Sequence, residues 1–386
     1  MAPTWPGEHF KIYCDDCQFG FIMDADNVPR SEFAVCPNCG YSKTSFKANL
    51  VVQPPKAKIL TDAIVDRWDL VAFQQSKNLD GNNEMIIKRV VGLPGEQIEI
   101  KNGNVVVNGQ AVVKPDAIFD ATKISVFNSM HQPKTMSIKR WNSVFEHSGW
   151  VNVNREWQFH NNAERKQTDW LIYNHIRGYR HAGLREKRFP IEDSYAYNQN
   201  LARQLRPISE LSFHVAAQFS LASELVMQIQ MPRCIGTATI SKTKALLEIK
   251  NSDGTVTKTK SGKSRLEMPV SQIKLSSIDG VLSLAIDSNN VAKIELPTSV
   301  NGPVEIRIGA KAGDLSVKHI QIFRDIYYLN SSTRQTQPFS KINLQDDEYF
   351  LLGDNIPISN DSRSFGPIKG KQILGTVLSK HETNLN

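Results

Sequence analysis

Short runs of β-favouring residues, separated by polar turns, recur through most of this chain and favour a mainly β fold. The runs are most regular in residues 208–325, where they repeat at a spacing of roughly 8–12 residues, the pattern of a β-sandwich. Similar runs fill residues 51–110, where Asn102-Gly103 lies between two alternating runs and indicates a hairpin. Residues 120–210 are less regular and look like long connections with short strands.

Length and composition describe an ordinary folded protein. The chain has 386 residues, enough for two or three domains at about 150 residues each. The formal net charge of +7 suits an anionic membrane surface or a polyanion, although a solvated surface explains it equally well. There is no block of five like charges, so we do not expect nucleic-acid binding. No stretch approaches the ~18 apolar residues of a membrane helix, and the N-terminus lacks a secretory signal, so we expect the chain as written to be soluble.

Two Cys-x-x-Cys pairs lie near the N-terminus. The first consists of Cys14 and Cys17 and the second of Cys36 and Cys39, and 18 residues separate them in the sequence. This is the spacing of a zinc ribbon, in which four thiolates hold the metal tetrahedrally. We therefore predict a structural zinc in a closed site, and no catalytic cofactor. Two disulfides are the alternative if the segment is exported to an oxidising compartment. Cys234 stands alone, and we expect it to be a buried small hydrophobe.

A lysine lies inside an apolar strand predicted within residues 85–96. By strand alternation, Lys88 shares a face with Ile86 and Val90. A lysine on a buried face loses hydration, which lowers its pKa, and a neutral lysine can act as a general base. The alternative is a lysine at a strand edge whose amine reaches water.

A second segment, residues 353–366, concentrates turn-forming residues whose side chains can hydrogen-bond. Asp361 and Arg363 are spaced so that they could form an ion pair, and Ser359 could reach a nearby polar group. Considered alone, this segment is a well-capped loop.

In this order, the two segments resemble motifs of the type I signal peptidases, the serine/lysine-dyad proteases of the S26 family. Residues 87–95 match the motif that carries the family's lysine, and residues 67–73 match the strand that precedes it. Residues 353–366 match the family's closing motif at every fixed position.

The resemblance implies a role for each matched residue. Lys88 would be the general base, and Ser359 would hydrogen-bond the lysine amine and orient it. Asp361 and Arg363 would brace the site.

The nucleophile of this family lies in a segment that follows a membrane anchor. Met1-Ala2-Pro3-Thr4 resembles that segment from its second position onward. The resemblance implies that residues 1–8 are a remnant of the nucleophile segment and that the serine would stand immediately before Met1. We therefore expect the polypeptide of residues 1–386 to be inactive, since it keeps the base and lacks the nucleophile.

The overall layout resembles the large, planctomycete-type members of the family. We expect a signal-peptidase-like β catalytic core in residues 51–120 and 326–386, with a zinc ribbon inserted at residues 9–50. Residues 121–325 would form a second insertion, in which a concanavalin- or laminin-G-like β-sandwich lies mainly in residues 208–325. The sandwich would bind a glycan or a protein ligand, or serve as a spacer.

The function that the resemblance implies is the removal of signal peptides by a serine endopeptidase. The partners would be exported preproteins with small residues at the cleavage site, together with the membrane surface. The full-length protein would lie in the inner membrane with its catalytic domain on the outer, periplasmic side. The alternative is a catalytically inactive binding or scaffold protein built from a zinc ribbon, a peptidase-like core and a lectin-like sandwich.

Overall fold

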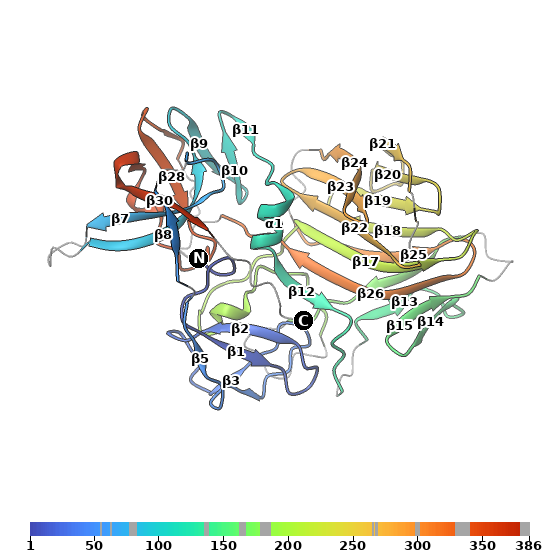
Figure 1. Ribbon diagram of the computed structural model, residues 1–386. Coiled ribbons are helices and arrows are strands. Elements are labelled where there is room, and N and C mark those ends of the chain that lie inside the picture. The colour runs from blue at the N-terminus through green and yellow to red at the C-terminus, as the bar shows by residue number, and fades with distance from the viewer. Residues whose placement is uncertain are drawn as a thin grey trace.

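The computed structural model describes residues 1–54, 56–61, 64–76, 83–134, 139–161, 167–177, 187–264, 266, 269–297, 302–328 and 340–378. Figure 1 shows a β-rich core on the left, a large sandwich on the right and a small N-terminal unit below. Strands make up most of the regular structure, so the predicted mainly β fold is confirmed. None of the described helices is long and apolar enough to cross a membrane.

The core is built around an antiparallel sheet of six strands drawn from the two ends of the sequence, in the order β29-β28-β8-β7-β30-β6. Its strand β7 is buried on both faces: Val71 and Phe73 pack on one side, and Leu70 and Ala72 pack on the other beside Trp5. A smaller sheet, β11-β10-β9-β27, lies next to it. The core strands are β6 (Lys58–Leu60), β7 (Leu70–Ser76), β8 (Asn83–Gly92), β9 (Gln97–Lys101), β10 (Asn104–Val107), β11 (Gln110–Ala111), β27 (Ile342–Asn343), β28 (Glu348–Leu352), β29 (Ile368–Lys369) and β30 (Ile373–Leu378).

The N-terminal unit carries the four paired cysteines. Strands β1 and β2 form an antiparallel hairpin that β5 extends, and β3 pairs with β4. Ile12, Phe21 and Met23 are buried with the cysteines, which gives this unit a small core of its own. The strands are β1 (His9–Tyr13), β2 (Gly20–Asp24), β3 (Phe33–Ala34), β4 (Thr44–Ser45) and β5 (Val51–Val52).

The sandwich consists of two antiparallel sheets that share one large hydrophobic core, which confirms this part of the expected fold. One sheet has the order β14-β15-β26-β17-β22-β23-β24, with β12 also paired to β26, and the other has the order β13-β16-β25-β18-β19-β20-β21. Strand β23 shows the alternation expected of a sheet with one buried face, because Leu282, Leu284 and Ile286 are buried. Cys234 is buried in the same core, as predicted.

Five short strands from the less regular part of the sequence also pair into the sandwich: β12 (Ile124–Asn128), β13 (Trp141–Ser143), β14 (Trp150–Val153), β15 (Glu156–Phe159) and β16 (Asp169–Tyr173). The remaining strands of the sandwich are β17 (Leu211–Phe219), β18 (Leu225–Gln230), β19 (Ile235–Ile240), β20 (Ala245–Lys250), β21 (Val256–Gly262), β22 (Ser271–Ile278), β23 (Val281–Ile286), β24 (Asn289–Glu295), β25 (Glu305–Ala310) and β26 (Leu315–Arg324).

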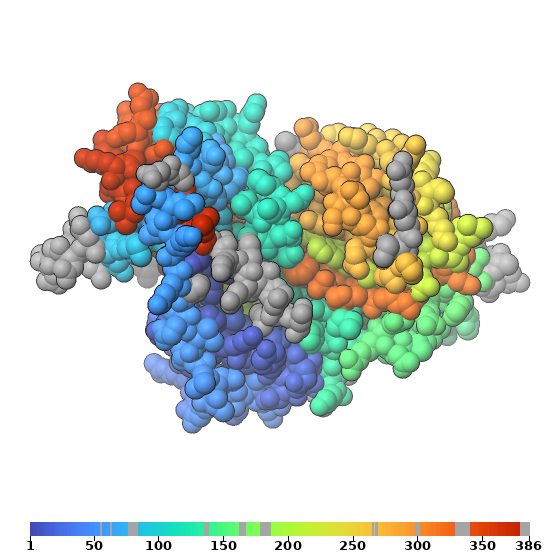
Figure 2. Space-filling view, in the orientation of Figure 1, coloured from blue at the N-terminus to red at the C-terminus, as the bar shows by residue number. Residues whose placement is uncertain are grey.

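A buried charge cluster joins the core to the sandwich. Lys114, just before helix α1 (Asp116–Thr122), has its Nζ 2.7 Å from Asp279 Oδ1 and 2.8 Å from Asp325 Oδ2. Glu210 completes the cluster and accepts a hydrogen bond of 2.7 Å from Asn104 Nδ2. Figure 2 shows the teal residues around α1 between the two lobes.

Burial and charge act together on the groups of this cluster. Burial alone would lower the pKa of Lys114, but the neighbouring carboxylates of Asp325 and Asp279 outweigh it and hold the pKa well above its ordinary value. Burial, reinforced by the charges of Asp279 and Asp325, raises the pKa of Glu210 to about 8. The ammonium of Lys114 is therefore the positive charge among three buried acidic side chains, those of Glu210, Asp279 and Asp325.

Replacing Lys114 by methionine is expected to lower the free energy of unfolding by about 3–5 kcal/mol, because it leaves Asp279 and Asp325 buried without a counter-charge. The measurement is the urea midpoint of the whole chain. Lys47→Met is the matched control, because Lys47 pairs with Glu32 on the exposed surface and such pairs contribute little. Equal midpoints for the two variants would contradict the importance of the cluster.

Candidate functional site

The structure brings Lys88 and Ser359 together. Lys88 lies on β8 opposite Val71 of the central strand β7, and its Nζ is 3.2 Å from Ser359 Oγ. Ser359 belongs to the loop that follows β28, and β28 pairs with β8 so that Leu352 lies opposite Arg89. The loop therefore begins beside the residue next to Lys88, which explains how two residues 271 positions apart meet.

The environment of Lys88 favours a neutral amine. The residue is partly buried, and this burial lowers the pKa of its amino group. The carboxylates of Asp361 and Asp354 oppose the shift, while the Arg363 guanidinium adds to it. The net direction is downward, so Lys88 releases its proton more readily than a lysine in water.

Asp361 and Arg363 form the ion pair for which their spacing is suited. Arg363 Nε and Nη2 donate to Asp361 Oδ1 and Oδ2 at 2.8 and 2.7 Å. Asp361 Oδ2 also accepts a 3.0 Å hydrogen bond from Gly353 N, and its side chain caps helix α2 (Ser362–Phe365). The completely buried Asp361 thus ties the start of the loop to its end.

A glycine is required at position 353 because the side chains of Ser359 and Lys88 lie close to its backbone. A Cβ at this position would overlap Ser359 Oγ and would lie 3.4 Å from Lys88 Nζ. Only a residue without a side chain leaves room for the contact between Lys88 and Ser359.

Three further residues of the site received no role from the sequence. Arg89 Nε and Nη2 donate to Asp354 Oδ1 and Oδ2 at 2.9 and 2.7 Å, and both side chains are buried. Thr4 Oγ1 donates to Asp354 Oδ2 at 2.5 Å and accepts from Arg89 Nη2 at 3.1 Å. All three lie inside the matched motifs, so their positions in those motifs were the available signal. Together they fasten the N-terminal segment to the core.

The amino group of Met1 lies within this charged neighbourhood. Burial lowers its pKa to about 6, and the charges of Asp354, Lys88 and Arg89 also act on it. Ala2 is buried, which holds the first residues against the protein. The N-terminal segment therefore presents its amine to the surroundings of Lys88.

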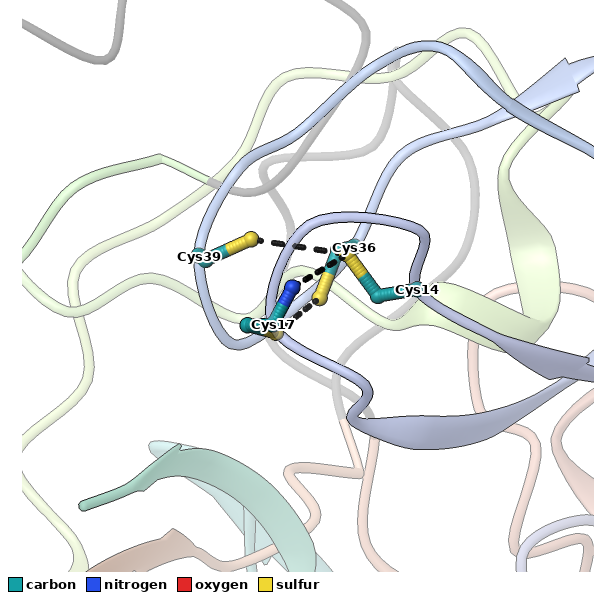
Figure 3. A group of neighbouring side chains, drawn as sticks. All are labelled: Cys14, Cys17, Cys36 and Cys39. Carbon is teal, nitrogen blue, oxygen red and sulfur yellow. Dashed lines mark hydrogen bonds between the residues drawn. The ribbon is translucent and has the colours of Figure 1, made fainter. Parts of the chain in front are cut away.

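The four paired cysteines gather into one cluster (Figure 3). All four are buried and none of them forms a disulfide, and the Sγ atoms of Cys14 and Cys39, and of Cys17 and Cys36, are 3.6 Å apart. A disulfide needs about 2.05 Å between sulfurs. Four thiolates about 2.3 Å from a tetrahedral zinc lie about 3.8 Å from one another, so the donor set fits this metal.

The cysteine cluster is fastened to the sandwich by Asn38, which lies between Cys36 and Cys39. Asn38 Nδ2 donates to the carbonyl of His131 at 2.8 Å, and its Oδ1 accepts from Asn128 N at 2.7 Å. The knuckle that carries two of the sulfurs is thereby part of an interface.

The sandwich carries a separate cavity of about 570 Å³ beside β13 and β16. None of the site residues suggested by the sequence lines it. Its wall mixes apolar residues with polar side chains, namely those of Asn142, Asn174, His175, Arg188 and Glu305.

Lys88 is expected to titrate below the ordinary lysine value of about 10.5, because burial disfavours its protonated form. The measurement is an NMR titration of ¹³C-labelled lysine side chains, in which the Lys88 signal is assigned by its loss in Lys88→Met. A pKa at or above the ordinary value would contradict the role of burial.

The family model described as "Signal peptidase, peptidase S26" matches residues 26–156 and 308–381, just over half of the chain. The search of curated proteins found no match to this chain.

Three of the solved structures that resemble this chain share little sequence identity with it. A galectin, LEC-6 of Caenorhabditis elegans, is 12% identical, with a TM-score of 0.24, and the match covers 30% of this chain and 82% of the galectin. The laminarinase catalytic domain of Thermotoga maritima is 6% identical, with a TM-score of 0.35 and coverage of 53% and 99%. The carbohydrate-binding module CBM66 of Bacillus subtilis is 8% identical, with a TM-score of 0.28 and coverage of 50% and 98%. The family model, in contrast, matches more than half of the chain, so the chain belongs to the signal peptidase family, peptidase S26.

Proposed function

We propose that this protein is a serine endopeptidase that removes signal peptides from exported preproteins, with Lys88 as its general base. The observation that carries the proposal is the 3.2 Å contact between Lys88 Nζ and Ser359 Oγ in a partly buried site of low lysine pKa. Membership of the family supports the reaction class.

Lys88 must be neutral when it takes a proton. Burial favours the neutral form by lowering the pKa of Lys88, and the hydrogen bond to Ser359 restricts the direction of the amine. Asp361 and Arg363 would act on this pair by holding the backbone on either side of Ser359, and their charges also act on the pKa of Lys88.

The nucleophile is proposed to be a serine hydroxyl presented from the position before Met1. Support comes from the N-terminal segment, which Thr4 holds against Asp354 and against Arg89, the neighbour of Lys88. In the reaction, Lys88 takes the hydroxyl proton as the serine oxygen bonds to the scissile carbonyl carbon. The lysine then gives the proton to the leaving amine, and water hydrolyses the acyl-enzyme with the same lysine as base. The serine N–H and a neighbouring donor would stabilise the oxyanion.

Exported preproteins with small residues before the cleavage point are the proposed substrates. The protein would act at the outer face of the inner membrane, where such substrates emerge. A glycan or protein ligand of the sandwich stays a prediction, and the cavity beside β13 and β16 is where we expect one to bind.

The proposal is tested with a polypeptide that carries one serine before Met1, exposed by removal of an initiator methionine. We expect it to cleave a fluorogenic peptide with an Ala-x-Ala site, and we expect residues 1–386 alone to show no cleavage. Adding Lys88→Met should lower the rate by at least about 100-fold, because the general base is lost. The value of kcat/KM should rise with pH and level off below pH 10.5, since only neutral Lys88 is competent.

The control is the same polypeptide with alanine before Met1, which should be inactive. If the serine and alanine forms behaved alike, the scaffold alternative would replace the peptidase.

We also propose that Cys14, Cys17, Cys36 and Cys39 hold one structural zinc. The gathering of four buried cysteine sulfurs, none of them in a disulfide, supports it, because such a donor set fits a tetrahedral site. With all four positions filled by protein, the metal would have no open position for substrate and would stabilise the N-terminal unit.

Metal analysis should therefore find one zinc per chain, and Cys17→Ala should lower both the zinc content and the thermal midpoint. Cys234→Ala is the matched control, because it also removes a buried thiol but lies in the sandwich core. Equal zinc loss in the two variants, or a folded chain without zinc, would contradict the assignment.

A further inference from the structure

Residues 195–199, which we name the bridging segment, contact three parts of the molecule that lie far apart in the sequence. The segment contains the one-turn helix η2 (Ala196–Asn198) and lies in the insertion, before the first long strand of the sandwich. In Figure 1 it is the yellow-green turn above β2.

Its first contact is with the loop that carries Ser359. Asn198 Nδ2 donates to Asn355 Oδ1 at 2.5 Å, and Asn355 Nδ2 donates to Asn198 Oδ1 at 3.0 Å. Both side chains are buried, so each amide satisfies the other where water is excluded. Asn355 is the residue after Asp354, the partner of Arg89.

Its second and third contacts are with the N-terminal unit and the N-terminal segment. Gln199 Oε1 accepts from Val35 N at 2.7 Å, and its Nε2 donates to Val35 O at 2.8 Å. Tyr197 accepts a 3.2 Å hydrogen bond from Gly7 N at its hydroxyl, and its ring packs with Ala2. The segment therefore holds Gly7, which precedes the cysteine cluster, and Val35, which lies just before Cys36, as well as the loop after β28.

The sandwich fixes the bridging segment in turn. Arg324, at the end of β26, is buried, and its Nη2 donates to the carbonyls of Asp193 and Ser194 at 3.1 and 2.6 Å. These two residues immediately precede the segment, so its position is set by a strand in the middle of a sheet.

We propose that Asn198 is a positioning residue for the peptidase site, acting through Asn355 to hold the loop that brings Ser359 to Lys88. This inference rests on the proposed function for its catalytic consequence. The loop after β28 is then fixed from one side by Arg89 of the core and from the other by Asn198. The bridging segment would therefore contribute to the geometry of the peptidase site.

Several independent contacts restrain the loop after β28. Asp354 is held by Arg89, and Gly353 is held by Asp361. Between Asn355 and Ser359, Ile356 packs in the core and Ser359 contacts Lys88, and the amide pair with Asn198 is the contact that ties the loop to the bridging segment. Removing it leaves a buried amide unsatisfied, and the loop can regain hydrogen bonds only by moving toward water.

The test uses Asn198→Ala in the polypeptide with serine before Met1. We expect kcat to fall by about 10- to 100-fold with little change in KM, as for a small displacement of a catalytic group. The double variant with Asn355→Ala should lose no more than the single variant, because both changes remove the same contact. The Lys88 pKa, followed by NMR, should rise toward its ordinary value as water enters.

Asn200→Ala is the matched control. Asn200 is exposed in the same stretch, and its Nδ2 donates to Asn27 of the N-terminal unit. The inference is overturned if Asn198→Ala matches Asn200→Ala in both kcat and the Lys88 titration, or if the effects of Asn198→Ala and Asn355→Ala simply add.

A second variant guards against misfolding. Asn198→Ser introduces no charge and keeps a hydroxyl that can donate to or accept from the Asn355 amide, so we expect a smaller loss of kcat than with alanine. If the parent polypeptide has no activity, the proposed function fails, while the Lys88 titration in residues 1–386 still decides the positioning role. An unchanged titration in both Asn198 variants would overturn it.

Discussion

The buried ion pair between Arg89 and Asp354 is the interaction on which the site depends. Two charges removed from water are stable only if their remaining hydrogen-bonding groups are matched, and here Trp68 O and Thr4 Oγ1 match the rest of the guanidinium. The pair thus joins a strand, a loop 265 residues away and the N-terminal segment at one point. Because neighbouring strand residues face opposite ways, fixing Arg89 on one face also fixes Lys88 on the other.

The sandwich and the bridging segment are bound to this core by polar contacts that water does not reach. Lys114 binds carboxylates supplied by the sandwich, and the amide of Asn198 meets that of Asn355. Buried polar groups of this kind tolerate only one arrangement, since any shift leaves a donor or a charge unsatisfied. The sandwich and the N-terminal unit are therefore held in defined orientations rather than tethered by flexible linkers.

The sequence predicts the parts of this structure whose signals are local. The alternation of buried and exposed positions in the strands after residue 208 predicts the sandwich. The spacing of the two Cys-x-x-Cys pairs predicts that the four cysteines cluster. The proximity of Lys88 and Ser359 could be expected only through resemblance to a family, because no local pattern links residues 271 positions apart.

Other features leave no local signal at all. The strands between residues 124 and 173 are three to five residues long, too short for alternation to show. Arg89 follows Lys88 in an apolar strand, and nothing nearby reveals that its partner is Asp354. Asn198 belongs to a stretch without periodicity, and its importance depends on a contact 157 positions away.

The interleaving of the core sheet has a consequence for the order of assembly during synthesis. Strand β30, from the end of the described chain, lies between β7 and β6, and β28 completes the other side of β8. Domains fold as the ribosome releases them, from the N-terminus onward. The cysteine unit and the whole sandwich emerge before either strand, so Lys88 stays without its partner Ser359 until the sandwich has been made. A protein built in this order brings the two residues together only after the sandwich can fold.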